Sequence, residues 1–334
     1  MKNELLKILK SSDDYISGEM ISDQLNVTRA AVWKAVNSLR AQGYNIVSMK
    51  HHGYRLEKSS AVYNERELRE QMDGSELLRD VSLSFFDEID STNLAARRDI
   101  DKLSGIALYV ANEQLAGRGR LGRTRQSDPD SGLWFSLMLR PDARPDKLAN
   151  LTLFAGLCVQ RALVKKTGLD IGIKWPNDLV AMPSGRKLCG ILTETVLEDL
   201  QVRAVIIGIG INVNNMTFAE EIKDVAGSLR LEGGQVYDRG SLLIAILHEL
   251  LGNFHEFEAA IDDDLTVPPW LDAYRQACVT IGRRVTISAA GDSVGEGIAE
   301  GLTPEGDITV RMDDGNVRTC HSGEVSVRGL AGYI

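Results

Sequence analysis

The chain has few cysteines and no long apolar run, and both absences narrow its possible functions. Its four cysteines are scattered, with no CxxC pair and no nearby histidine cluster, which argues against disulfides and a zinc site. The longest apolar runs, such as 204–211, fall far short of the roughly 18 to 20 residues that cross a bilayer. The first ten residues mix lysine with leucine and lack the block order of a signal peptide. We therefore expect a cytoplasmic protein with reduced thiols.

Length and charge indicate several modules of different character. The 334 residues suit two or three domains, because domains typically run about 100 to 200 residues. The net charge of −9 is unevenly spread: residues 1–58 hold nine Lys/Arg and six Asp/Glu, a net of +3, so the remaining 276 residues carry −12. A basic segment on an acidic protein is typical of a DNA-binding module attached to another domain.

Residues 1–64 have the pattern of a winged helix-turn-helix domain. Gly18 to Leu25 predicts a short amphipathic helix, and Thr28 is a candidate N-cap for the next helix. Two strand-like runs, 46–50 and 54–58, are joined by His51-His52-Gly53 and predict the wing. The second helix has four apolar residues at helical spacing on its predicted buried face: Val32, Ala35, Val36 and Leu39.

The outward face of that helix carries side chains that suit DNA contacts. A helical protein-interaction domain is the alternative, but a basic wing beside an outward Arg, Trp and Asn set favours DNA. Trp33 is the weakest member of the set, because a tryptophan on a helix more often packs than contacts bases. The predicted DNA-binding residues are Arg29, Trp33, Lys34, Asn37, Arg40 and, in the wing, Arg55.

The rest of the chain predicts two further domains. Between 65 and 277, strand-like runs alternate with helical stretches such as 150–167 and 240–261, which indicates an α/β or α+β domain. From 278 to 334 the pattern changes to five short strands separated by Gly-rich turns, which predicts a small β-barrel.

The segment GRGRLGRTR at 117–125 is the most informative motif, because four arginines alternate with three glycines and no acidic residue occurs between Gln114 and Ser127. Its glycines satisfy GxGxxG, but a dinucleotide-binding turn must open a helix, and TRQSDPDSG continues here as a loop. A loop that closes over an anion fits better, with bidentate arginine donors beside close backbone approach. A solvated basic loop without a ligand is the alternative.

Two lysine-containing segments follow, KWPNDLV at 174–180 and RKLCGILTE at 186–194. Asn177 and Asp178 are expected at the start of a strand, where an aspartate could hold Mg²⁺, although an Asn-Asp pair is more often a turn. Gly190 permits close backbone approach to a ligand. Lys187 can lie inside the fold only if it is paired with an anion.

Two shorter motifs complete the set. DSTN at 90–93 follows a strand and opens a helix, so Ser91 or Thr92 is an expected N-cap, and capping alone would explain one hydroxyl. GIGIN at 208–212 has glycine at alternate strand positions, which suggests that a ligand lies against the sheet.

Together these motifs resemble the biotin–protein ligases over nearly the whole chain, including the N-terminal domain of the bifunctional biotin operon repressors. The motifs occur in the family's order: DSTN, Gln114 with AGRGRLGR, KWPND, RKLCGI and GIGIN. The resemblance implies a winged helix-turn-helix domain, a central catalytic domain of the class II synthetase/biotin ligase type and a C-terminal SH3-like barrel. The corresponding boundaries are 1–64, 65–277 and 278–334.

The resemblance also implies residue roles. The biotin-binding residues are Ser91, Thr92, Asn93, Gln114, Arg118, Gly119, Arg120, Lys187 and Gly190. The nucleotide-binding residues are Arg120, Arg123, Lys174, Asn177, Asn212, Ser228 and Arg328. The catalytic residues are Lys187, Arg118, Arg120, Asp178 and Lys174, with Asp178 as a Mg²⁺ ligand or a base.

The implied activity is ATP-dependent transfer of biotin, through biotinyl-5′-AMP, to a lysine of a biotin carboxyl carrier domain, combined with repression of biotin genes. The implied partners are this carrier, operator DNA and a second copy of the chain when adenylate is bound. A lipoate-type ligase is one alternative, against which the Arg-Gly loop argues. A ligand-sensing repressor without ligase activity is the other, and retention of both lysines and Asp178 argues against it.

Overall fold

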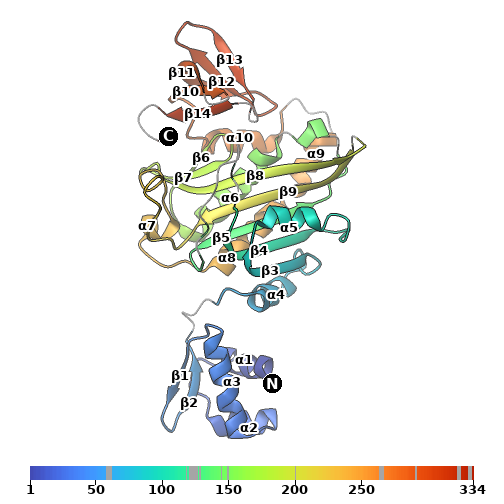
Figure 1. Ribbon diagram of the computed structural model, residues 1–334, viewed down its shortest axis with the longest axis vertical. Coiled ribbons are helices and arrows are strands. Elements are labelled where there is room, and N and C mark those ends of the chain that lie inside the picture. Colours follow the sequence, from blue (N-terminus) through green and yellow to red (C-terminus); the bar gives the residue numbers. More distant parts are fainter. Residues whose placement is uncertain are drawn as a thin grey trace. The chain divides into compact units, whose positions relative to one another are not determined.

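The computed structural model describes the whole chain except residues 58–61, 118, 120–126, 128, 144, 149, 200, 263–266, 290–291, 322–324 and 330–332. For residues 146–147, 260–262, 289, 292–293 and 325–329 only the backbone is described. The chain forms two compact units, Met1–Glu67 and Leu68–Ile334, both drawn in Figure 1.

The N-terminal unit consists of three helices and a hairpin, as the sequence predicts. The helices are α1 (Lys2–Lys10), α2 (Gly18–Leu25) and α3 (Arg29–Ala41), and the hairpin pairs β1 (Ile46–Met49) with β2 (Gly53–Leu56). Thr28 is the N-cap of α3, because its hydroxyl accepts a hydrogen bond from the N–H of Ala31 at 3.2 Å. The N-cap role predicted for Thr28 is therefore confirmed.

Helix α3 contributes the centre of the N-terminal core. The four residues of its predicted buried face are each at most 2% exposed, and they pack with Leu5, Leu6 and Leu9 of α1. The opposite face of α3 consequently points outward, and Trp33 on it is 57% exposed. Trp33 therefore does not pack into this core, which removes the main objection to placing it on a contact surface.

The second unit is built on a seven-stranded sheet with the order β3-β4-β5-β9-β8-β7-β6. Among the described strands only β3 and β4 pair in parallel, and the other neighbours are antiparallel, so the domain is of the α+β type. The strands are β3 (Ser82–Ile89), β4 (Ala107–Gln114), β5 (Gly132–Leu139), β6 (Ile171–Lys174), β7 (Asp178–Ala181), β8 (Lys187–Glu198) and β9 (Gln201–Asn212).

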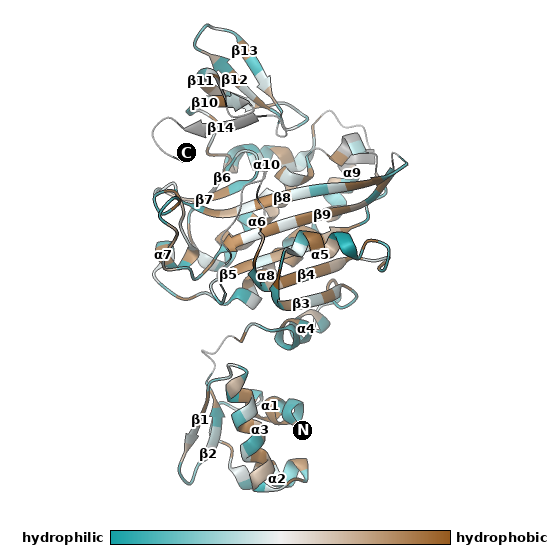
Figure 2. Ribbon diagram, in the orientation of Figure 1, coloured by the Kyte–Doolittle hydropathy of each residue, from teal (hydrophilic) through white to brown (hydrophobic). Residues whose placement is uncertain are grey.

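Helices lie on both faces of this sheet. Asn93 of α5 lies against Gly208, whereas Gly156 of α6 lies against Ile191, whose side chain points to the opposite face. Figure 2 shows hydrophobic residues along β4 and β9, two inner strands of the sheet, as expected for strands covered on two sides. The helices are α4 (Glu65–Asp73), α5 (Thr92–Arg98), α6 (Leu151–Thr167), α7 (Leu229–Gly233), α8 (Arg239–Gly252), α9 (Phe254–Asp262) and α10 (Pro269–Ala277).

The helix expected over 240–261 is wrong as a single element, because α8 ends at Gly252 and α9 begins at Phe254. The change of direction brings aromatic rings together. Phe257 lies 5.3 Å from Phe154 between ring centroids, and Phe154 lies 5.6 Å from Trp270 of α10. This apolar contact outweighs continuation of the helix through Asn253.

The C-terminal segment forms a five-stranded antiparallel sheet with the order β13-β12-β11-β10-β14. Within the described residues the pairing ends at β13 and β14 and does not close, so the expected closed SH3-like barrel is not confirmed. The strands are β10 (Arg284–Ala289), β11 (Asp292–Leu302), β12 (Ile308–Met312), β13 (Val317–Cys320) and β14 (Val325–Gly329).

Trp175 joins this small sheet to the central domain. Its indole N–H donates to the carbonyl of Gly306 at 2.9 Å, and its backbone N–H donates to the Thr280 hydroxyl at 3.0 Å. Trp175 is 1% exposed, so the contact is fully buried. The C-terminal sheet is therefore fixed beside the start of β7.

Candidate active site

One row of the seven-stranded sheet organises the candidate site. Directly paired residues of neighbouring strands point to the same face, and the row runs through six strands. Its members, in order, are Lys174, Asp178, Gly190, Gly210, Trp134 and Ala111. Gly190 and Gly210 have no side chains, so they leave a flat strip of backbone, here called the glycine floor, between charged residues on one side and Trp134 on the other.

Beside Trp134 lies a set of polar side chains, here called the amide–hydroxyl cluster: Thr92, Asn93 and Ser136, which are buried, and Gln114, which is half-buried. Gln114 Oε1 accepts hydrogen bonds from the Thr92 backbone N–H at 2.8 Å and the Thr92 hydroxyl at 3.2 Å. Ser136 Oγ lies 2.7 Å from Thr92 Oγ1 and 2.5 Å from Asn93 Oδ1. The sequence-predicted residues 92, 93 and 114 are thus brought together.

Two features hold the Asn93 amide in one orientation. Its Nδ2 donates to Glu194 Oε2 of β8 at 2.6 Å, so Oδ1 faces Ser136. Gly208 makes room for it, because a Cβ at Gly208 would lie 2.2 Å from Asn93 Oδ1. The glycine at 208 is therefore required by the close approach of the chain's own Asn93 side chain, whereas the alternating GIGIN pattern had suggested a ligand against the sheet.

Sequence reasoning missed Ser136 and Glu194. Ser136 was detectable, because it is the one polar residue in GLWFSLML, a strand buried along its whole length. A buried hydroxyl among apolar residues needs a partner, and that need marks it as part of a polar site. Glu194 gives no such signal, because it is half-exposed and joins the site only through the pairing of β8 with β9.

The start of DSTN is fixed by a carboxylate. Asp90 accepts a hydrogen bond from the Ser91 N–H at 2.7 Å and two from the Arg98 guanidinium at 2.8 and 3.0 Å. Arg98 and then the Ser91 N–H lower the pKa of Asp90 to about 2. Ser91 occupies the N-cap position of α5, but its side chain makes no capping bond. Its hydroxyl is thus not used for capping.

At the other end of the glycine floor lies the lysine–aspartate cluster, Lys174, Asp178 and Lys187. Lys187 Nζ is 2.5 Å from Asp178 Oδ1, and Lys174, at 6% exposure, is buried. Burial is the largest single influence and raises the pKa of the Asp178 carboxyl, but Lys187, Tyr333 and Lys174 together outweigh it, so that this pKa lies below its ordinary value. Lys187 is thus paired with an anion, as its position inside the fold requires.

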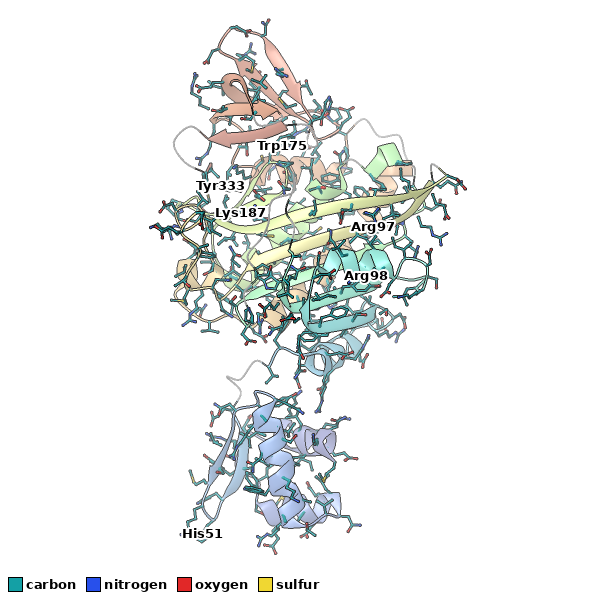
Figure 3. The ribbon with its side chains drawn as sticks, in the orientation of Figure 1. His51, Arg97, Arg98, Trp175, Lys187 and Tyr333 are labelled. Carbon is teal, nitrogen blue, oxygen red and sulfur yellow. The ribbon has the colours of Figure 1, made fainter. Side chains whose placement is uncertain are left out.

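Tyr333, one residue from the C-terminus, joins this cluster and was missed by sequence reasoning. Its hydroxyl donates to Asp178 Oδ2, and its ring lies 3.6 Å from Lys174 Nζ and 5.9 Å from Lys187 Nζ. Figure 3 labels Tyr333 and Lys187 next to each other at the same edge of the sheet. No local motif predicts this contact, because it joins residues that are 155 positions apart in the sequence.

The backbone of Lys187 is held by the segment before α7. Its N–H donates to the Val225 carbonyl at 2.8 Å, and its carbonyl accepts from the Gly227 N–H at 2.9 Å. Asn212 Nδ2 donates to the Gly227 carbonyl at 2.9 Å, and Ser228 caps α7 by accepting from the Leu231 N–H at 3.1 Å. Asn212 and Ser228 therefore lie beside Lys187, where a nucleotide site was predicted, with these groups engaged in holding the backbone.

The Arg-Gly loop lies mostly outside the described residues, which exclude Arg118, Arg120 and Arg123. Gly119 is described and half-buried, and Arg328 is described only in its backbone. Asn177 Nδ2 donates to the Ile191 carbonyl at 3.0 Å, so this donor is engaged by the backbone of β8. The predicted binding roles of these residues remain predictions.

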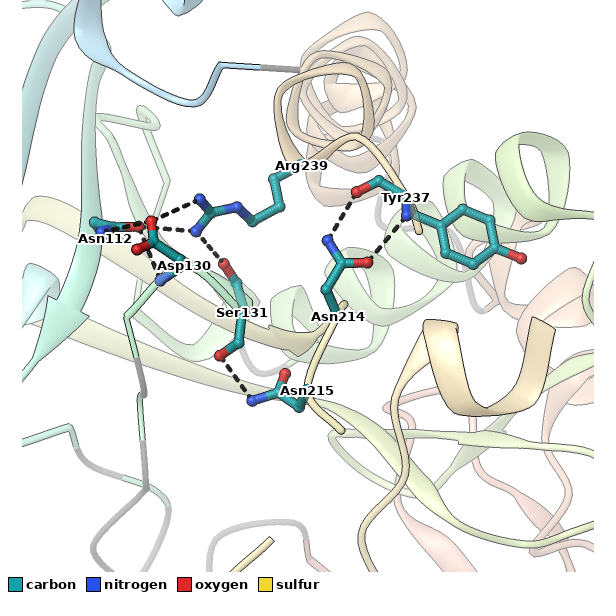
Figure 4. A network of polar contacts seen from close by, with 8 residues as sticks. Asn112, Asp130, Ser131, Asn214, Asn215, Tyr237 and Arg239 are labelled. Atoms are coloured by element: carbon teal, nitrogen blue, oxygen red, sulfur yellow. Dashed lines mark hydrogen bonds and ion pairs between the residues drawn. The ribbon is translucent and has the colours of Figure 1, made fainter. Parts of the chain in front are cut away.

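The end of that loop is anchored by the network in Figure 4. Arg239 of α8 donates to Asn112 Oδ1 at 2.8 Å and lies 3.4 Å from Asp130 Oδ1. Asn215, just after β9, donates to the Ser131 hydroxyl at 2.9 Å. The chain that leaves the Arg-Gly loop is thus tied to the chain that leaves β9 and leads to the Lys187-holding segment.

The predicted DNA-binding residues lie on α3 and in the wing of the N-terminal unit. Arg29, Trp33 and Lys34 are exposed, and Arg29 lies 3.2 Å from Glu19.

Two other predicted DNA-binding arginines are engaged within the N-terminal unit. The Arg40 Nε donates to the Ile46 carbonyl at 2.7 Å, and its Nη1 donates to Asn37 Oδ1 at 3.3 Å. Arg55 lies 2.5 Å from Glu57 Oε1 and 4.8 Å from the Tyr15 ring centroid. The exposed members are thus best placed for contacts, and all of these roles remain predictions.

The described part of the chain has neither a cluster of metal-ligating side chains nor a membrane-spanning helix. No group of three or more His, Cys, Asp or Glu side chains gathers there in an arrangement that could hold a metal ion. None of its helices has the length and apolar character needed to cross a membrane.

Comparison with known proteins identifies the family. A protein named bifunctional ligase/repressor BirA from Bacillus subtilis strain 168 is 38% identical over 255 residues, which cover 74% of this chain and 76% of that protein. This chain belongs to the biotin protein ligase family. The likewise named Escherichia coli K12 protein is 29% identical over 321 residues, covering 96% of this chain and 95% of the relative.

Family profiles and a solved structure agree with this membership. The profile of the biotin/lipoate A/B protein ligase family matches residues 85–212, an HTH domain profile matches 2–55, and the biotin protein ligase C terminal domain profile matches 280–328. The Aquifex aeolicus biotin protein ligase, solved in complex with biotin and ATP, is 30% identical with a TM-score of 0.62. The match covers 74% of this chain and 99% of that one. The ligase family thus spans both the central and the C-terminal domains.

Proposed function

We propose that this protein is a bifunctional biotin ligase and repressor. It joins biotin to a lysine of a biotin carboxyl carrier domain through biotinyl-5′-AMP, at the expense of ATP, and it represses biotin genes through its winged helix-turn-helix domain. Support comes from relatives named ligase/repressor along most of the chain and from a ligase profile together with an HTH profile. The proposed domain boundaries are those predicted from the sequence.

The observation that carries the ligase assignment is the glycine floor with an uncharged, hydrogen-bonding cluster at one end and lysines at the other. Thr92, Asn93, Gln114 and Ser136 offer donors and acceptors that suit the uncharged head of biotin. A bicyclic ligand lying on the floor would then direct its carboxylate toward Lys187. The substrate has a neutral head and an anionic carboxylate, and the site would match them with its uncharged cluster and its lysines.

In the first reaction a biotin carboxylate oxygen attacks the α-phosphorus of ATP, and the bond from that phosphorus to pyrophosphate breaks. Both reactants are anions, so Lys187 and Lys174 lower the barrier by neutralising the charge on the carboxylate and the phosphates. In the second reaction an acceptor lysine amine attacks the acyl carbon, AMP departs and the amine loses a proton. Asp178, held ionised beside Lys187, is our candidate acceptor for that proton.

Asp178 also fits Mg²⁺ brought with ATP, because Mg²⁺ is usually bound by one or two carboxylates together with substrate phosphates. Bound there, the ion would neutralise phosphate charge. We further propose that the C-terminal sheet belongs to an SH3-like barrel, that the adenylate-bound protein forms a homodimer that binds operator DNA, and that the protein acts in the cytoplasm.

Biotin-dependent ATP–pyrophosphate exchange tests the first reaction, with lipoate in a parallel assay. We expect exchange with biotin and none with lipoate, because the family profile covers both acids whereas the named relatives are biotin ligases. Exchange with lipoate alone would assign the chain to the other branch, and no exchange with either acid would leave a ligand-sensing repressor. The variant Asp178→Asn with full activity would exclude the proposed role of Asp178.

A further inference from the structure

The last two residues of the chain, Tyr333 and Ile334, here called the C-terminal tail, dock on the charged half of the site. Tyr333 donates its hydroxyl to Asp178 and places its ring 3.6 Å from the Lys174 ammonium. Ile334 lies against Gly185 in the turn between β7 and β8, because a Cβ there would meet Ile334 Cγ1 at 3.0 Å. The tail therefore has two contact points in the central domain, one polar and one apolar.

These contacts use the groups that the proposed reaction requires. Lys187 lies at Asp178 Oδ1 and the Tyr333 hydroxyl is at Oδ2, so the carboxylate has a partner at each oxygen. The face of Lys174 toward Tyr333 meets an aromatic ring, where an ATP phosphate would otherwise be attracted. Tyr333 and the phosphates of ATP consequently compete for Lys174, and the Tyr333 hydroxyl also engages the Asp178 carboxylate, which would hold Mg²⁺ brought with ATP.

The tail lies beyond residue 328, where the match to the family profile of the C-terminal domain ends. Its position therefore does not follow from the profile match. The described contacts of the tail include one hydroxyl, one ring and one aliphatic group, and a ligand with several negative charges can compete with them for the lysines.

We propose that the C-terminal tail is an autoinhibitory contact. In the ligand-free enzyme Tyr333 contacts Asp178 and Lys174, and ATP must displace it to bind. This inference rests on the proposed ligase function, since it concerns the nucleotide half of the same site. It makes Tyr333 a determinant of ATP affinity and leaves the biotin half of the site untouched.

Substitution of Tyr333 tests the proposal in the full-length protein. For Tyr333→Ala we expect the KM for ATP in the exchange assay to fall about 5- to 20-fold, because a hydrogen bond to a carboxylate and a cation–π contact no longer oppose binding. Tyr333→Phe keeps the ring and loses the hydroxyl, so it should give an intermediate KM. The KM for biotin should not change in either variant, and Tyr54→Phe in the N-terminal unit is the matched control.

The outcomes separate this inference from the proposed function. An unchanged KM for ATP with normal exchange would overturn the inference alone, and a raised KM with lower kcat would make Tyr333 a positioning residue instead. Absence of exchange in the wild type would overturn the ligase function.

Trimming by carboxypeptidase, followed by intact mass, gives a readout that needs no catalysis. Loss of Ile334 and Tyr333 should be about tenfold or more faster with Mg-ATP than without it, because the displaced tail is open to the protease. A tenfold shift in that equilibrium corresponds to about 1.4 kcal/mol. Equal trimming rates with and without Mg-ATP would contradict displacement of the tail.

Discussion

The two ends of the glycine floor differ in how their polar side chains are paired within the protein. In the amide–hydroxyl cluster the side chains bond to one another, and Thr92 and Ser136 are at most 3% exposed. In the lysine–aspartate cluster two cations share one carboxylate, and the Lys187 side chain is 32% exposed. The first end holds its uncharged groups in place before any ligand binds, whereas at the second end two ammonium groups lie near one carboxylate.

This difference separates recognition from chemistry. A preformed cluster loses little entropy on binding and rejects ligands that leave its polar groups unpaired. A cluster with excess charge discriminates little among anions, but it stabilises charge that develops during phosphoryl transfer. Substitutions at the two ends should therefore affect different kinetic constants.

The largest effect is expected at Lys187. For Lys187→Met the rate of biotin-dependent exchange should fall about 10²- to 10³-fold, the usual cost of removing one charge-stabilising donor from an active site. The KM for biotin should change much less, because the amide–hydroxyl cluster remains intact. Steady-state exchange kinetics at saturating ATP measure both constants.

Lys102→Met is the matched control, because it removes the same ammonium from an exposed pair with Asp99 at 2.6 Å. Exchange should then be unchanged. If Lys187→Met instead raised the KM for biotin and spared the rate, the assignment of the two ends would be reversed.

A smaller effect, at the opposite end, is expected for Gly208→Ala. The new methyl group would lie 2.2 Å from Asn93 Oδ1, so the amide must move away from Ser136 and Glu194. We expect the KM for biotin to rise about tenfold and the unfolding free energy to fall by about 1 to 3 kcal/mol, as for other overpacked sites. Exchange at saturating biotin should be nearly normal.

Gly301→Ala is the control, since the nearest atom to its added methyl group, Thr309 Oγ1, is 3.9 Å away. An unchanged KM for biotin in Gly208→Ala, despite a measurable loss of stability, would show that the amide–hydroxyl cluster does not bind biotin.

The sequence was sufficient for most of the fold. Hydrophobic spacing located the buried face of α3, and short strand-like runs between Gly-rich turns predicted the five C-terminal strands. These signals are local, because periodicity is set by neighbours within one element. The break between α8 and α9 was not predicted, since it depends on Phe257 packing against Phe154 about a hundred residues earlier.

The candidate site shows the same limit. Thr92, Asn93, Gln114 and Lys187 carry recognisable motifs, and the structure brings the first three together and pairs Lys187 with Asp178. The glycine floor could not be predicted, because it depends on the register that places Gly190 opposite Gly210. Nor could Tyr333, whose contact with Asp178 is a product of tertiary packing alone.

The smallest effect concerns Asp90, which fixes the start of α5 and so supports the amide–hydroxyl cluster. Its pKa of about 2 lies below the ordinary value of 3.8, so its ionised form stabilises the folded state fully above about pH 4 and loses that contribution as the pH falls toward 2. The carboxylate is 40% exposed, which limits the contribution to about 0.2 to 1 kcal/mol.

Urea unfolding measures this contribution. The difference in unfolding free energy between wild type and Asp90→Asn should be constant from pH 7 to 5 and shrink below about pH 4. Asp80→Asn is the control, because Asp80 is 93% exposed and lies 3.8 Å from Arg79. A difference that stayed constant to pH 3 would show that Asp90 acts through its shape, since its charge would then contribute nothing to the fold of this end of the site.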